Sequence, residues 1–268
     1  MFKDNKKYGL LLLTVLLISS SCGEFNKVVK STDSDFRYKK AIEYYEIGQY
    51  SRASILFSDV IQIYRGTSKA EDVYFYYAKS LFELGDYLNS GIWFRTLIRE
   101  NPRSKHGEES QFMVGYCYYK DSPKPRLDQT VTQKAIDALQ LYVNIFPNSE
   151  RLDESNRLIA ELRDKLVYKT YLTGILYYDM KNYSAATIAL TNSLKKFPDT
   201  KYREELSFKL LESKYNLALY SNLDKKELRL SDALDEYYAF VDEFPESKYR
   251  RQAERFHRDT SRLLNYDN

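Results

Sequence analysis

Bulky apolar and aromatic residues recur at helical spacing through most of the chain, with polar positions between them. In the segment 74–102 they lie three, four and seven positions apart, which places them on one face of a helix. Gly85 permits a tight turn within this segment, and Pro102 ends it because proline cannot continue a helix. Ala78 and Ser90 are small where two antiparallel helices must approach closely. The segment therefore predicts a helix pair.

The same pattern returns along the chain at the spacing of a tetratricopeptide repeat. In segment 74–102 it is carried by Tyr74, Tyr77, Ala78, Leu81, Gly85, Asp86, Tyr87, Ser90, Phe94, Leu97 and Pro102. A copy that begins at Arg37 matches at Ala41, Tyr44, Gly48, Tyr50, Ala53 and Phe57. A copy that begins at Thr170, with Lys181 in place of the turn glycine, matches at Gly174, Tyr177, Tyr183, Ala186, Leu190 and Pro198. Two further copies are interrupted. The first, split by residues 121–132, matches at Gly115, Tyr118, Ala135, Leu139, Tyr142 and Pro147. The second matches at Ala233, Tyr237, Phe240 and Pro245.

Four junctions between the predicted helices share the sequence Pro-x-Ser/Thr. They are Pro102–Ser104, Pro147–Ser149, Pro198–Thr200 and Pro245–Ser247. The proline ends one helix, and we expect the hydroxyl two residues later to cap the next. After the first repeat Gly66, Thr67 and Ser68 play the same part, and Ser68 with Glu71 matches a capping box.

The pattern predicts an all-α protein, a superhelical solenoid of about five tetratricopeptide-type helix pairs with a C-terminal capping helix. Helices are expected near residues 35–47, 50–64, 69–84, 87–100, 105–120, 130–146, 150–181, 183–196, 201–220, 230–243 and 247–264. The helix at 150–181 is long because no proline interrupts it, and it joins the two halves of the stack. We expect N-terminal repeats 1–3 over 35–147, and repeats 4–5 with the capping helix over 148–268.

The first residues have the pattern of a secretory signal rather than of the folded body. Three lysines at positions 3, 6 and 7 precede an apolar run over 10–18, which is about half the length of a membrane-spanning helix. Serines then lead to Cys22, as in a lipobox, although Ser19 stands where leucine is usual. We therefore expect a signal peptide over 1–21 and a lipid on Cys22; an ordinary signal peptide with an incidental cysteine is the alternative. Residues 22–34 read as a short polar tether.

Charge and composition favour binding over chemistry. Removal of residues 1–21 lowers the formal charge from +3 to +1, which gives no footprint for nucleic acid. Cys117 is then the one unmodified cysteine, so no disulfide can form within the chain. It has no partner base nearby in sequence, and His106 and His257 are too far apart to suggest a metal site. Acidic residues alternate with basic ones, as on a solvated helix face. We expect that the protein is not an enzyme and that it has no catalytic residue, bound metal or cofactor.

The repeat pattern also predicts which side chains do not pack in the core. First-helix residues between the packing positions should face a concave groove, and in repeats one and two they are Tyr38, Ile42, Tyr45, Phe75, Lys79 and Phe82. An apolar groove with one cation suits an extended peptide or the edge of a helix. The alternative is that the chain itself covers the groove.

The lipobox-like start, five repeats, an interrupted third repeat and a long helix after Phe146–Ser149 together resemble the BamD family of outer-membrane assembly factors. The likeness covers roughly residues 35–220 and is greatest over 146–219, which contain Arg157–Leu166, Tyr177-Tyr178 and Phe197–Thr200. It implies a scaffold in the machine that folds β-barrel proteins into the outer membrane.

In that family the C-terminal repeats contact periplasmic domains of the barrel-forming BamA subunit, and an N-terminal groove is proposed to hold a signal of the unfolded client. The resemblance implies that Tyr38, Ile42, Tyr45, Phe75 and Phe82 face clients and that residues 150–264 face the partner subunit. It also implies a lipid-anchored location on the periplasmic face of the outer membrane, in agreement with the absence of an acidic run after Cys22.

Other functions remain open at the level of sequence. A repeat lipoprotein that scaffolds cell-wall, division or glycan-uptake proteins would have the same pattern. The abundance of tyrosine, 26 residues, suggests a glycan-binding lipoprotein, although the chain has little room for large loops between repeats. A hydrolase lacks a nucleophile with its base or a pair of carboxylates.

Overall fold

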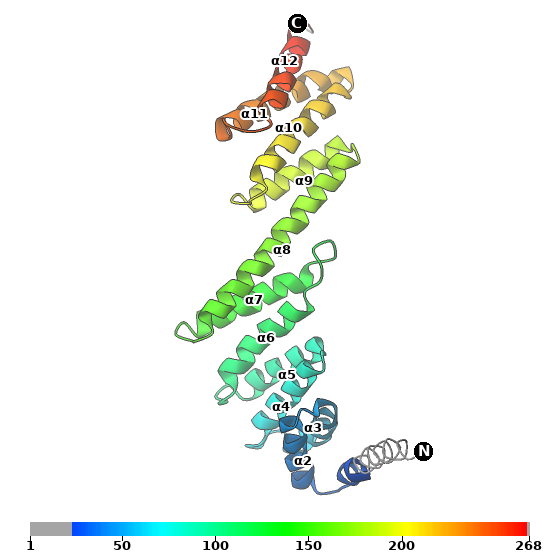
Figure 1. The fold of residues 1–268 in the computed structure, drawn as a ribbon, viewed down its shortest axis with the longest axis vertical. Coiled ribbons are helices and arrows are strands. Elements are labelled where there is room, and N and C mark those ends of the chain that lie inside the picture. The colour runs from blue at the N-terminus through cyan, green and yellow to red at the C-terminus, as the bar shows by residue number, and fades with distance from the viewer. Residues whose placement is uncertain (1–22, 267–268) are drawn as a thin grey trace, which may run out of the picture. The chain divides into compact units, whose positions relative to one another are not determined.

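Every regular element is a helix in the computed structural model, which describes residues 23–266 (Figure 1). A short N-terminal helix over 23–29 comes first. The longer helices are α2 (Ser34–Glu46), α3 (Tyr50–Tyr64), α4 (Ala70–Glu83), α5 (Tyr87–Glu100), α6 (Gly107–Asp121), α7 (Thr130–Ile145), α8 (Leu152–Asp179), α9 (Tyr183–Lys196), α10 (Arg203–Leu219), α11 (Leu223–Glu243) and α12 (Arg250–Tyr266). The all-α prediction is confirmed. The signal peptide and Cys22 lie outside the described residues.

The chain forms two compact units, and the boundary falls inside α8. Unit 1 contains the described residues up to 123 together with 129–162, and unit 2 contains 124–128 and 163–266. The sequence placed the division near residue 147. The structure places the boundary after residue 162, because Leu158 and Leu162, in the first half of α8, are buried in unit 1.

The helices of each unit pair in sequence order, with small residues at the contacts. In the α4–α5 pair the Ser90 hydroxyl donates a hydrogen bond of 2.8 Å to the backbone oxygen of Ala78, and both residues are fully buried. The repeat period is visible in the polar contacts as well. His106 with Asp72, Tyr142 with Glu108 and Tyr171 with Glu205 each join residues 34 positions apart, the length of a tetratricopeptide repeat.

The turn inside a repeat requires a left-handed residue. Gly48 and Gly85 have φ of 75° and 80°, and glycine adopts these values without strain. Lys181, predicted to replace glycine in the fourth repeat, has φ of 57° and is the one non-glycine residue with positive φ among the described residues.

The hydroxyls at the Pro-x-Ser/Thr junctions accept hydrogen bonds from backbone N–H groups before the helix, and not from its first turn as predicted. Ser104, Ser149, Thr200 and Ser247 each accept a hydrogen bond from the backbone N–H two residues later, at 3.1–3.3 Å, in the turn before the next helix. They therefore order the approach to the helix and do not cap it. At the first junction Thr67 makes this bond to the Lys69 N–H, so the capping box expected at Ser68 is wrong.

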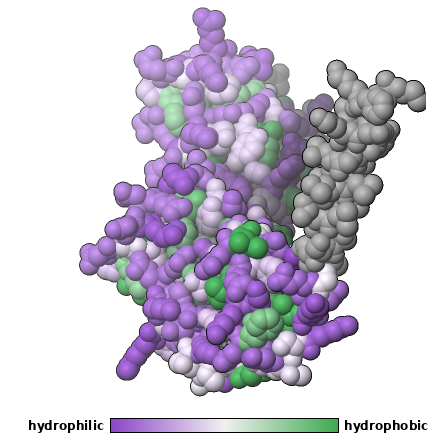
Figure 2. Space-filling view, turned by 60° about the horizontal axis from the view of Figure 1, so that its bottom comes forward, coloured by the Kyte–Doolittle hydropathy of each residue, from purple (hydrophilic) through white to green (hydrophobic). Residues whose placement is uncertain are grey.

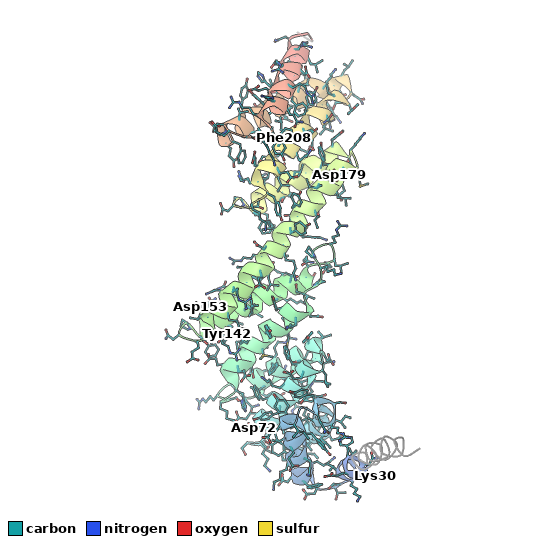
Figure 3. The ribbon with its side chains drawn as sticks, in the orientation of Figure 1. Lys30, Asp72, Tyr142, Asp153, Asp179 and Phe208 are labelled. Atoms are coloured by element: carbon teal, nitrogen blue, oxygen red, sulfur yellow. The ribbon has the colours of Figure 1, made fainter. Side chains whose placement is uncertain are left out.

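Unit 2 has its own apolar core, which includes the last helix. Phe208 of α10, labelled in Figure 3, packs with Leu211, Phe240 of α11, and Ala253 and Phe256 of α12. Helix α11 begins at Leu223 rather than at 230, because residues 223–229 are good helix formers without a breaker. No helix within residues 23–266 is both long enough and apolar enough to cross a membrane.

The segment expected to be a tether is partly folded. Val28 in the N-terminal helix is 2% exposed, and the ring of Phe25 lies edge-on to Tyr44 at 5.7 Å. The Nζ of Lys40 is 3.9 Å from the Glu24 carboxylate. Residues 23–29 therefore pack against the first repeat, whereas composition alone indicated a polar linker.

Candidate polypeptide-binding surface

The first helices of the three N-terminal repeats present a row of aromatic rings. Tyr45 of α2 meets Tyr76 of α4 with ring centroids 5.1 Å apart, and Phe82 of α4 stacks on Tyr116 of α6 at 5.6 Å. These side chains are half-buried, so part of each ring remains accessible. We call the set Tyr38, Ile42, Tyr45, Tyr76, Phe82 and Tyr116 the aromatic surface.

Phe75, one of the residues predicted for the groove, is not part of this surface. It is 5% exposed, and the imidazole of His106 stacks on its ring with centroids 3.9 Å apart. Its other side packs edge-on against Phe94. The next residue, Tyr76, takes the partly exposed position instead. The prediction failed because the ring that covers Phe75 comes from the following repeat.

The predicted cation of the groove is paired. The Lys79 ammonium lies 3.0 Å from the Glu109 carboxylate of α6. Asp72 is likewise held by Lys105 at 2.9 Å and by His106 at 2.7 Å. Burial opposes ionisation of Asp72, but hydrogen bonds from His106 and Lys105 outweigh it and lower its pKa. Lys79 and Asp72, two charged residues beside the Phe75–His106 pair, are therefore neutralised by partners within the protein.

Tyr38 and Tyr45 of the aromatic surface are neutral phenols at physiological pH. Burial, with a smaller contribution from Tyr50, Glu83 and Glu109, raises the pKa of Tyr45 to about 12. Burial also raises the pKa of Tyr38. The hydroxyls of Tyr38, Tyr45 and Tyr76 form no hydrogen bond to another described residue. They are available as donors and acceptors at the edge of an apolar surface.

Residues that the sequence reasoning missed follow the repeat period. Tyr76 lies 34 positions after Ile42, and Tyr116 lies 34 positions after Phe82. Moving the predicted set forward by one repeat would have found both. The same shift from Phe75 reaches Glu109, but its pairing with Lys79 and the stacking of His106 on Phe75 depend on contacts with α4 that only the folded chain shows.

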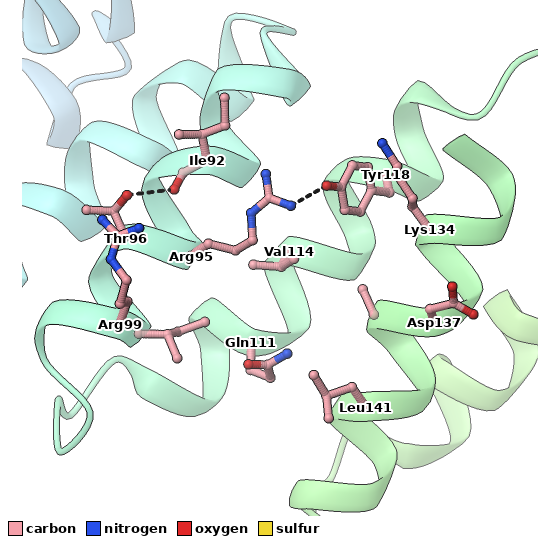
Figure 4. A pocket seen from close by; sticks show the side chains of 12 residues that line it. Ile92, Arg95, Thr96, Arg99, Gln111, Val114, Tyr118, Lys134, Asp137 and Leu141 are labelled. Atoms are coloured by element: carbon pink, nitrogen blue, oxygen red, sulfur yellow. Dashed lines mark hydrogen bonds between the residues drawn. The ribbon is translucent and has the colours of Figure 1, made fainter. Parts of the chain in front are cut away.

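A cleft lies elsewhere in unit 1, between α5, α6 and α7 (Figure 4). Its volume is about 850 Å³, and Gln111 and Val114 of α6 lie in its lining together with Ile92 and Leu141. Arg95 crosses it to donate a hydrogen bond to the Tyr118 hydroxyl, and its guanidinium lies 5.3 Å from the centre of that ring.

The described residues offer little for catalysis. Within 23–266 no group of three or more His, Cys, Asp or Glu side chains is arranged to hold a metal ion. Burial raises the pKa of the Cys117 thiol to about 11, and its one polar partner is the Ser90 hydroxyl at 3.4 Å. A buried neutral thiol is a poor nucleophile.

Helix pairs that stack at a 34-residue period, with aromatic rings along their first helices, define a tetratricopeptide-type repeat protein. The chain belongs to the YfiO family of outer membrane lipoproteins, whose pattern residues 30–230 match. It is 25% identical over 242 residues to the putative outer membrane protein assembly factor BamD of Aquifex aeolicus, covering 88% of this chain and 78% of the relative. The family predicted from the sequence is confirmed.

Solved structures that align with this chain include two tetratricopeptide proteins. The TPR2AB domain of yeast Sti1, in a complex with pHSP90, is 15% identical, with 85% of this chain and 98% of that chain aligned and a TM-score of 0.39. A thermophilic TPR protein of Thermus thermophilus is 16% identical, with coverage of 84% and 98% and a TM-score of 0.35.

Proposed function

We propose that this chain is a non-enzymatic scaffold for the assembly of β-barrel proteins, anchored through lipid on Cys22 to the periplasmic face of the outer membrane. The aromatic surface holds segments of unfolded clients, and the C-terminal repeats dock on a barrel-forming subunit of the BamA type. Membership of an outer membrane lipoprotein family and similarity to a putative BamD support this function. The single observation that carries the client role is the aromatic surface itself.

The chemistry of the aromatic surface matches a strand of an unfolded barrel. Such strands alternate apolar and polar side chains and carry aromatic residues near the membrane interfaces. Half-buried rings of the aromatic surface offer contact area to the apolar side chains of such a strand. The hydroxyls of Tyr38, Tyr45 and Tyr76 can form hydrogen bonds with the backbone of an extended chain. Because Lys79 and Asp72 are already paired, these two residues do not favour a charged peptide.

Docking of the barrel-forming subunit is assigned to unit 2. Large apolar side chains are exposed there, among them Ile188 at 62%, Leu228 at 68% and Leu223 at 84%. Apolar side chains that gather on one surface mark sites where a second protein binds, and Leu223 and Leu228 share one helix, α11. The aromatic surface belongs to unit 1 and these residues belong to unit 2, so the two proposed roles use different residues.

A peptide-binding measurement tests the client role. The probe is an uncharged, fluorescein-labelled peptide of alternating aromatic and polar residues, and its anisotropy is followed as protein is added. Tyr45→Ala combined with Phe82→Ala removes two accessible rings and should weaken binding by about tenfold or more, as expected for aromatic anchors. The circular dichroism and melting temperature of the variant should show that the helices remain folded.

The control removes two aromatic rings from a different place. Tyr183 and Tyr220 stack on each other in unit 2, with centroids 6.3 Å apart, and Tyr183→Ala with Tyr220→Ala should leave the affinity unchanged. Equal affinities of the wild type and the Tyr45/Phe82 variant would show that the aromatic surface is not the client site.

A further inference from the structure

The N-terminal helix joins the start of the described chain to one particular end of the first repeat. The Arg52 guanidinium lies 5.3 Å from the centre of the Phe25 ring and 5.5 Å from that of Tyr44. Tyr44 belongs to the last turns of α2, and Arg52 belongs to the first turn of α3. Phe25 is therefore fixed at the end of the repeat where the chain turns from α2 into α3.

The same end exposes apolar side chains from two turns. Ile47, between α2 and α3, is 65% exposed; Leu84, between α4 and α5, is 48% exposed; and Leu88, in the first turn of α5, is 59% exposed. We call these three residues the turn edge. The two turns are neighbours, since Leu84 lines one shallow hollow with Gly48, Gln49, Tyr50, Ser51 and Arg52. Figure 2 turns the N-terminal repeats toward the viewer and shows hydrophobic residues in green among the hydrophilic ones.

The position of Cys22 indicates what covers the turn edge. Cys22 directly precedes Gly23, so their Cα atoms are about 3.8 Å apart. Phe25 follows Gly23 by about 3 Å along the helix. Acyl chains on Cys22 would thus enter the bilayer within about one helical turn of Phe25. An extended tether over 22–34 would instead reach about 40 Å and leave the first repeat free to move away.

We propose that the turn edge rests on the lipid bilayer that holds the anchor, with the N-terminal helix as a short strut between the two. This interaction depends on the acylation of Cys22 proposed above. The strut is held by the buried Val28 and by the contact of Phe25 with the first repeat. It keeps the α2–α3 and α4–α5 turns at the membrane surface, next to the membrane into which clients are inserted.

The charges around the turn edge define the lipid it contacts. Residues 46–50 and 83–88 contain Glu46, Glu83 and Asp86 but no lysine or arginine, and Arg52, the cation of the shallow hollow, lies over the rings of Phe25 and Tyr44. The contact is therefore apolar, not an attraction between basic residues and anionic headgroups. It should persist at high salt and be stronger on zwitterionic than on anionic lipid.

A quenching experiment tests the contact on the full, acylated protein in phosphatidylethanolamine–phosphatidylcholine vesicles. Bimane is attached to Ile47→Cys or, as the control, to Ser68→Cys at the opposite end of α3, about 22 Å away. Cys117 is 2% exposed and does not compete for the label. Phosphatidylcholine with brominated acyl chains should quench bimane at position 47 and leave bimane at position 68 bright, equally at low and high salt.

Two further variants separate the parts of the proposal. A flexible glycine–serine insert between Cys22 and Gly23 keeps the anchor but releases the strut, and it should abolish quenching at position 47. With bimane at Leu88→Cys, the changes Ile47→Glu and Leu84→Glu should reduce quenching, whereas Ile55→Glu and Ile63→Glu add the same charge elsewhere on exposed sites and should not.

The outcomes distinguish this inference from the function on which it rests. Intact mass that shows no acyl group on Cys22 would overturn the anchor and the strut together. If the protein is acylated but brominated lipid leaves bimane at position 47 as fluorescent as bimane at position 68, the strut alone is overturned. The proposed client and docking roles are then unaffected. Quenching that disappears at high salt would contradict the apolar contact.

Discussion

Single small residues set the distance between helices in this protein. Gly115 of α6 lies against Leu139 of α7, and a Cβ at Gly115 would come within 2.8 Å of Leu139 Cδ2 and 3.1 Å of its backbone nitrogen. Leu139 is fully buried and cannot move aside. A side chain at this position has to displace Leu139 or move α6 away from α7, so glycine is required here because it is small and not because it is flexible.

Gly115→Ala should therefore destabilise unit 1 by about 1–3 kcal/mol, the usual cost of overpacking a filled core. Urea denaturation followed by circular dichroism measures the change. Gly107→Ala is the matched control, because a Cβ at Gly107 meets nothing within 4 Å. Equal stability of the two variants would mean that α6 and α7 are not packed this closely.

Lys181→Gly should have the opposite effect. The left-handed conformation costs an L-residue roughly 1–2 kcal/mol, and glycine adopts it freely, although glycine also gains freedom in the unfolded chain. We expect a net gain of about 0.5–1 kcal/mol in the urea transition of unit 2. Arg258→Gly, at an exposed site inside α12, should instead lose about 1 kcal/mol. A loss at position 181 as large as that at 258 would argue against the turn.

At the scale of elements, the sequence predicts most of the helices because prolines, glycines and small residues mark their ends. It predicts the ends of α2 to α10 to within three residues. What it misses depends on contacts between distant residues. His106 covers Phe75, Glu109 pairs with Lys79, and the first repeat buries Val28, none of which leaves a local pattern. The two features that bear on the aromatic surface, the covering of Phe75 and the pairing of Lys79, thus come from the following repeat.

The N-terminal helix can be tested separately from the rest. Val28→Ala removes two buried methyl groups and should weaken the docking of the helix by about 1–2 kcal/mol. Amide hydrogen exchange should then be roughly tenfold faster across residues 23–30 and unchanged in α4 to α7. Lys27→Ala, at an exposed neighbour, should leave exchange as it is. Slow exchange in both variants would show that Val28 does not hold the helix.

At the scale of the whole molecule, each part of the chain has one proposed task. The proposed lipid and the N-terminal helix place unit 1 at the membrane, the aromatic surface receives unfolded polypeptide, and unit 2 offers apolar residues to a partner. Each task needs binding without chemistry, in keeping with paired charges and a buried, neutral Cys117. The family places the chain among outer membrane lipoproteins. The barrel-forming partner is the part of the proposed function that distinguishes this chain from other repeat scaffolds.

Isolation of the native complex tests that claim most directly. The tagged protein is extracted from its own membranes in a mild detergent, and the components that remain with it in stoichiometric amounts are identified by mass spectrometry. We predict one barrel-forming protein with periplasmic domains, lost when exposed residues of unit 2 such as Leu223 and Leu228 are changed to glutamate. Peptidoglycan enzymes or glycan-uptake proteins as the stoichiometric partners, without a barrel-assembly subunit, would contradict it.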